Sequence, residues 1–201
     1  MVYRTTPKMQ KRKATRRRGL LDVATRLFGR RGYHGTTVPM VVSESGSSTG
    51  SFYNYFENKE DLFAQVLVSI GERLSAELNQ AIAQADEPIG RMRAAVERLF
   101  LFLAANPAEA RILLVESSGL GGRLAALQRE ILGSHARSVE LAITAVKGRR
   151  SPGDPAILAR CWVGAVYEAV RFWYELPTKK RPSPTEVANQ VAAFNLRGIG
   201  R

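Results

Sequence analysis

The chain has 201 residues, of which 45% are hydrophobic, enough to bury a core and to exclude a largely disordered protein. Lysine and arginine number 30 against 18 acidic residues, which gives a formal net charge of +12. This excess indicates a polyanionic partner, either nucleic acid or an anionic membrane surface. Charge alone does not distinguish between the two.

Composition also excludes several kinds of site. Cys161 is the only cysteine, so neither an intrachain disulfide nor a CxxC metal site can form, and we interpret it as a small buried hydrophobic residue. No apolar run approaches the roughly 18 residues that a membrane span needs. The basic start is followed by charged residues rather than by a secretory signal. We therefore expect a cytoplasmic protein with no membrane partner.

The first 18 residues carry eight lysines and arginines and no acidic residue. We predict that residues 1–14 form a disordered basic arm. One interpretation is a solvated, solubilising tail. The other is a DNA-binding segment, in which Arg16, Arg17 and Arg18 can enter a minor groove.

Three short helices are predicted after this arm, over residues 15–31, 38–45 and 49–56. Apolar residues recur every three or four positions in the first, and Gly32 ends it. Pro39 lies in the first turn of the second, which Gly46 ends, and Ser48 is an N-cap candidate for the third. Two short helices joined by a tight glycine turn are typical of a helix-turn-helix.

The rest of the chain is predicted to be helical, with breaks where proline and glycine gather. The expected helices cover residues 59–84, 89–105, 107–117, 122–147, 155–175 and 184–196. No stretch keeps the alternation of a strand for more than a few residues. The predicted fold class is therefore all-α.

Small and polar residues gather on and beside the third predicted helix. Its start is small enough to approach base edges closely, and the hydroxyl and ammonium groups at the helix ends can contact phosphates. Asn54 is the only amide there, and it faces either DNA or plain solvent. Tyr53 can instead be a core residue with a satisfied hydroxyl. The candidate DNA-binding residues are Arg16, Arg17, Arg18, Thr36, Thr37, Ser47, Ser48, Thr49, Gly50, Ser51, Tyr53, Asn54, Tyr55 and Lys59.

This part of the chain resembles the TetR family of bacterial regulators. The resemblance rests on residues 20–28, Gly32-Tyr33, Thr36-Thr37-Val38 and residues 46–59, and most specifically on Gly50-Ser51-Phe52-Tyr53-Asn54-Tyr55-Phe56 and Lys59-Glu60-Asp61-Leu62-Phe63. Two segments depart from it. The family usually has an acidic residue followed by Ile-Ala where this chain has Met40-Val41-Val42, and Ala-Gly-Val where it has Ser45-Gly46-Ser47.

The resemblance implies a homodimeric regulator that binds a palindromic double-stranded operator, usually as a repressor, and responds to a small-molecule effector. It implies that Tyr53 and Lys59 contact phosphate. It also implies an effector pocket among the middle helices, in apolar surroundings with a few polar groups. The candidates are Phe100, Leu103, Leu114, His135, Trp162, Val166 and Val170, and the alternative is that most of them are ordinary core.

The predicted helix over residues 155–175 is apolar on most sides, so one face needs a partner unless it is buried wholly within one chain. Small residues that permit close helix approach fall near one stripe. The predicted dimer interface is Ala156, Ala159, Val163, Gly164, Tyr167 and Arg171. The resemblance implies that this helix and the one over residues 184–196 form a four-helix bundle across a two-fold axis.

The predicted organisation is a basic arm over residues 1–14, a helix-turn-helix domain over 15–62 and a helical effector-binding and dimerisation domain over 63–201. We recognise no catalytic set, metal cluster or cofactor motif, so no enzyme, metal or cofactor is predicted. Two rival functions remain open. One is a DNA-packaging protein with no effector, and the other is an enzyme or membrane-surface protein that uses the arm as an anchor.

Overall fold

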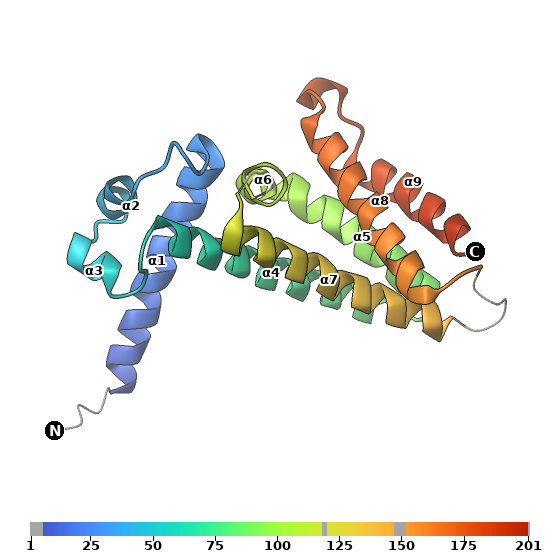
Figure 1. Ribbon diagram of the computed structural model, residues 1–201, viewed down its shortest axis with the longest axis horizontal. Helices are drawn as coiled ribbons and strands as arrows, with labels where there is room; N and C mark the ends of the chain where they lie inside the picture. The colour runs from blue at the N-terminus through green and yellow to red at the C-terminus, as the bar shows by residue number, and fades with distance from the viewer. Residues whose placement is uncertain (1–5, 118–119, 147–151, 201) are drawn as a thin grey trace.

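The structure, a computed structural model, describes residues 6–117, 120–146 and 152–200 (Figure 1). Its elements are α1 (Pro7–Arg31), α2 (Val38–Glu44), α3 (Thr49–Tyr53), α4 (Lys59–Ala83), α5 (Pro88–Ala105), α6 (Pro107–Arg111), the π-helix η1 (Ile112–Glu116), α7 (Gly122–Ala145), α8 (Pro155–Glu175), the 3-10 helix η2 (Thr178–Lys180) and α9 (Pro184–Gly198). These ranges contain no strand, and the all-α prediction is confirmed. None of their helices is long and apolar enough to cross a membrane.

Local capping explains where most helices begin. Thr37, Ser48 and Asn58 each accept a hydrogen bond from the backbone N–H three residues further on, at 3.4, 3.2 and 2.9 Å. Proline stands in the first two positions of α2, α5, α6, α8 and α9, where its missing N–H removes no helical bond. The predicted starts of these helices agree with the structure to within one residue.

The start of α1 differs from the prediction. Thr6 caps the helix by accepting from the N–H of Met9 at 3.4 Å, and residues 7–14 are helical rather than disordered. Lysine, arginine, glutamine and alanine all have high helix propensity. The prediction of disorder considers only the high charge and low apolar content of this segment. Residues 1–5 of the predicted arm lie outside the described residues. The described side chains of the segment are exposed on a helix that projects from the molecule (Figure 1).

The head, which we define as α1, α2 and α3, lies at one end of the molecule, and α4 leads from it into the body, α4 to α9 (Figure 1). In the body α5 lies against α4 and α9, and α7 lies against α8. Phe28 of α1 and Phe63 of α4 are fully buried and meet edge-to-face, with ring centroids 4.9 Å apart. This aromatic contact fixes α4 to the head.

Two glycines let the end of α1 approach the body closely. A Cβ on Gly29 would lie 2.5 Å from the Cβ of Ala108 in α6. Gly32 ends the helix, as predicted, with φ +75° and ψ 171°, a backbone region that residues with a side chain scarcely enter. A Cβ there would also lie 2.8 Å from Oε2 of Glu116.

We expect Gly32→Ala to lower the free energy of unfolding by about 1–3 kcal/mol, because the alanine either strains the backbone or forces the end of α1 to shift. Thermal unfolding followed by circular dichroism measures this loss. Gly71→Ala is the matched control, since its added Cβ meets nothing within 4 Å and φ there is not positive. Equal melting temperatures for the two variants would contradict the expectation.

Candidate nucleic-acid interface and internal cavity

A tight turn sets α3 against α2. Gly46 has φ +64°, and the N–H of Ser47 donates to the carbonyl of Val42 at 3.1 Å. Phe52 and Phe56 are buried on the inner side. The outer side of α3 is therefore turned to solvent, which is the arrangement that lets a helix enter a major groove.

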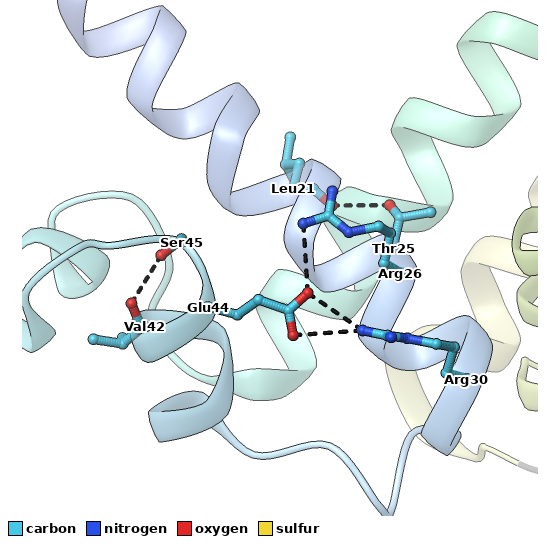
Figure 2. A network of polar contacts seen from close by, with 7 residues as sticks. All are labelled: Leu21, Thr25, Arg26, Arg30, Val42, Glu44 and Ser45. Carbon is cyan, nitrogen blue, oxygen red and sulfur yellow. Dashed lines mark hydrogen bonds and ion pairs between the residues drawn. The ribbon is translucent and has the colours of Figure 1, made fainter.

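An arginine pair on α1 holds the end of α2 (Figure 2). Arg26 donates to Oε1 of Glu44 at 3.4 Å. Arg30 donates to both oxygens of the same carboxylate, at 3.3 and 3.5 Å. The carboxylate sits at the negative end of a helix dipole, where two cations offset the repulsion. These pairs are largely exposed and contribute little stability, so their main effect is on the orientation of α2.

Most of the candidate DNA-binding residues are at least partly exposed to solvent. Tyr53 is 57% exposed, so the interpretation of it as a core residue is wrong. The other exposed candidates are Arg16, Arg17, Arg18, Thr37, Ser48, Thr49, Gly50 and Asn54, and the half-buried ones are Ser47, Ser51, Tyr55 and Lys59. Arg17 donates through Nε and Nη2 to Oε1 of Gln65, at 3.2 and 2.5 Å, which directs its guanidinium toward α4.

Thr36 is a correction to the predicted set. Its side chain is fully buried, and its hydroxyl donates to the carbonyl of Gly32 at 2.8 Å. This bond satisfies an acceptor at the end of α1, so the hydroxyl is unavailable to DNA. The sequence placed Thr36 beside Thr37, and adjacent threonines in an extended segment point to opposite sides.

Lys59 begins α4 and lies against the turn that follows α1. Its Nζ donates to the carbonyl of Tyr33 at 3.0 Å and stands 4.3 Å from the centre of the Tyr33 ring. An ammonium group has three N–H donors, so this bond leaves capacity for a phosphate oxygen. The contact holds the lysine in place at the edge of the exposed face.

The body contains a cavity of about 180 Å³ between α4, α5, η1, α7 and α8. Its lining is mainly leucine, isoleucine and valine. Six of the seven predicted pocket residues line it, namely Leu103, Leu114, His135, Trp162, Val166 and Val170. Phe100 is a correction: it is fully buried and packs edge-to-face on Trp173, with centroids 5.7 Å apart, outside the lining.

Four polar side chains interrupt the apolar lining. Gln128 donates to the hydroxyl of Tyr167 at 3.1 Å, and Ser117 donates to the carbonyl of Leu113 at 2.7 Å. Burial lowers the pKa of His135, so its imidazole is neutral at neutral pH. His135 is the only α7 residue in the predicted pocket, although Gln128, Ile131, Leu132 and Val139 recur with it at the spacing of one helix face and also line the cavity.

The lowered pKa of His135 predicts a pH dependence of stability. The unfolded chain binds this proton more readily than the folded chain, so the stability that a neutral His135 provides is lost as the pH falls below about 6.5. His135→Gln keeps a polar side chain without the titration, and its melting temperature should fall less between pH 7 and pH 5 than that of the wild type. Parallel curves for the two proteins would contradict this.

The predicted dimer stripe on α8 faces mostly inward. Ala159 is fully buried, so the interface prediction is wrong for this residue. Val163 and Tyr167 are half-buried and line the cavity. Ala156 is half-buried. Arg171 pairs with Glu168 and Glu175 at 2.7 and 2.6 Å. Only Gly164 of the stripe is exposed.

The opposite side of α8 carries the large exposed apolar residues. Ile157 and Phe172 are 62% and 60% exposed, and Phe194 of α9 is 66% exposed. Cys161 lies on the same side and is exposed, so its interpretation as a buried hydrophobic residue is wrong. We call these residues, with Gly164, the α8–α9 face.

The head and the start of α4 match a family model described as bacterial regulatory proteins, tetR family, over residues 20–66. A similar protein is the uncharacterized HTH-type transcriptional regulator YxaF of Bacillus subtilis (strain 168), 34% identical over 74 residues. The match covers 36% of this chain and 39% of that protein. The chain thus matches well under half of the length of the curated relatives.

Solved structures resemble the whole fold. The regulator FadR from Bacillus subtilis, in complex with stearoyl-CoA, superposes with a TM-score of 0.77 at 20% identity, covering 90% of this chain and 98% of that one. AibR, in complex with isovaleryl coenzyme A and operator DNA, gives 0.71 at 22% identity, covering 89% and 97%. At these identities the likeness shows the shared fold.

Proposed function

We propose that this chain is a member of the TetR family of bacterial regulatory proteins, and that it is a homodimeric, sequence-specific DNA-binding repressor of the cytoplasm that a small-molecule effector releases from its operator. The observation that carries the proposal is the presence of two sites in one chain. The head presents a solvent-facing helix-turn-helix, and the body contains an apolar cavity. We assign residues 15–62 to DNA binding and 63–201 to effector binding and dimerisation.

The charges of the head support the DNA partner. Lys8, Lys11 and Arg12 are exposed on the projecting end of α1, on the same element as the candidate residues Arg16 to Arg18. Such a segment follows the groove and releases counterions as it pairs with phosphates. It adds affinity for all sequences, while the small N-terminal end of α3 approaches base edges.

The cavity supports the effector and its chemical class. Its walls favour an apolar group, and the structural neighbours FadR and AibR hold stearoyl-CoA and isovaleryl coenzyme A. We propose that the effector carries an apolar acyl group. At about 180 Å³ the cavity is close in size to one of about 150 Å³ that binds benzene, so it has room for a short or branched acyl group.

Selection of genomic fragments on the purified protein, followed by footprinting, tests the proposal. A palindromic site with half-sites one helical turn apart, or a multiple of it, is the expected result. Acyl-CoA esters of increasing chain length are then added to the complex, and short ones should release the DNA. Retention of fragments without a common site would favour the DNA-packaging function, and preference for anionic vesicles over DNA would favour the membrane-surface function.

A further inference from the structure

One carboxylate of the body caps the end of α1 in the head. Oε2 of Glu116, the last residue of η1, accepts the N–H of Tyr33 at 2.8 Å. Oε1 accepts from Nε of Arg111 at 3.0 Å, and the Glu116 side chain is only 13% exposed. A hydrogen bond from a backbone N–H to a charged, shielded acceptor is stronger than one between neutral groups.

The local sequence leaves room for this contact. Gly32 has no side chain where the Glu116 carboxylate lies, since a Cβ there would be 2.8 Å from Oε2. Arg111 also donates through Nη1 to the carbonyl of Arg30 at 3.4 Å. Glu116 and Arg111 thus bind backbone groups on both sides of Gly32, and a shift of their segment moves the end of α1.

The same segment forms part of the cavity wall. Leu113, Leu114 and Ser117 line the cavity, and they lie on or directly after η1. The N–H of Ser117 donates to the carbonyl of Ile112 at 3.1 Å, which is the five-residue spacing of a π-helix. Single π-helical turns are uncommon and recur at functional sites, and a return to α-helical spacing turns the following residues to a new direction.

On the head side, the Tyr33 residue joins Glu116 to Lys59. Its N–H is bound by Glu116 and its carbonyl by Nζ of Lys59, at 2.8 and 3.0 Å. Lys59 is a candidate phosphate contact at the edge of the helix-turn-helix. A continuous set of contacts therefore runs from the cavity wall through Glu116 and Tyr33 to the DNA-facing surface.

We propose that Glu116 is the positioning residue that couples the cavity to the head. An occupant that displaces Leu113 and Leu114 changes the register of η1 and withdraws the carboxylate from the N–H of Tyr33. The end of α1 and the Tyr33 carbonyl then move together, and Lys59 loses the acceptor that holds it in place. This inference rests on the proposed function for its biological meaning, but its structural part is measurable without DNA.

Hydrogen exchange at the Tyr33 amide reports directly on the contact. In full-length Glu116→Ala, exchange of this amide should rise at least about tenfold, the size expected for loss of a hydrogen bond to a charged acceptor. Glu77→Ala is the matched control, since it removes an ion pair with Arg98 between α4 and α5. Unchanged exchange in Glu116→Ala would overturn the proposal.

A filled cavity tests the coupling without knowledge of the effector. Val166→Phe places extra volume in the cavity from α8, and it should raise Tyr33 exchange at least about fivefold, the lower end of allosteric couplings. In the Glu116→Ala background the same change should add nothing further. Effects that multiply in the double variant would show that Glu116 lies outside the coupling, and would overturn the proposal.

If Val166→Phe does not fold, the cavity can be filled in two other ways and the same double-variant comparison carried out. Leu132→Phe fills the cavity from α7, and benzene-saturated buffer fills it with no substitution. DNA binding is measured in parallel on a fragment that the wild type retains. Should the wild type retain no fragment selectively, the proposed function fails, while the exchange cycle still decides whether Glu116 couples the cavity to α1.

Discussion

Replacing Phe172 by glutamate is expected to convert the proposed dimer into a folded monomer. Phe172 is 60% exposed on α8, beside the 66% exposed Phe194 of α9, and we propose that a second copy covers both. In a two-fold interface each substitution occurs twice, so two buried aromatic contacts are lost together. At about 2 kcal/mol for each such contact, the dissociation constant of the dimer should rise about 1,000-fold.

The loss of the dimer should also lower operator affinity, because a monomer engages one half-site where the dimer engages two. Light scattering over a concentration series and DNA titrations measure the two effects. Leu141→Glu is the matched control, since Leu141 is 73% exposed on α7 and lies off the α8–α9 face. A native dimer in Phe172→Glu, with unchanged dissociation constant, would show that the partner binds elsewhere, and a monomeric wild type would show that no second copy covers the α8–α9 face.

Most helix starts followed from the sequence because their causes are local. Capping residues and prolines act within one turn, and α8 begins and ends where its pattern predicts. The choice of face on α8 did not follow, since an apolar helix offers two faces and the pattern does not say which one its own chain covers. The sequence pattern therefore predicts Val163 and Tyr167 on the partner's side, whereas in the structure both line the cavity.

In the candidate sites, too, the features set by local sequence could be predicted, and those set by packing between distant segments could not. The exposure of Tyr53 and the burial of Phe52 follow from their positions on a short amphipathic helix. The burial of Thr36 depends on how α1 ends, and the position of Phe100 depends on which neighbour of α5 it meets. The π-helical turn of η1 is likewise set by packing between α1 and the body, and nothing in the local pattern of residues 112–116 predicts it.

Lys59→Ala is expected to weaken binding to all DNA sequences by similar factors. Removal of one phosphate contact per protomer should reduce the slope of log affinity against log salt by about 0.9 per protomer. At physiological salt we expect about a tenfold loss per half-site, because a charge-assisted hydrogen bond contributes about 1.5–3 kcal/mol. Titrations at several salt concentrations, on operator and on unrelated duplex, measure both quantities.

The lysine also bonds the Tyr33 carbonyl, so its removal can act through the fold as well as through charge. Lys59→Gln separates the two, because its amide can still donate to that carbonyl but carries no charge. If charge is what matters, both variants show the flatter salt slope and only the alanine variant shifts the melting temperature. Tyr53→Phe, which removes an exposed hydroxyl and keeps the ring, should weaken binding without changing the slope. Normal operator binding by all three variants would mean that this side of the head does not face DNA.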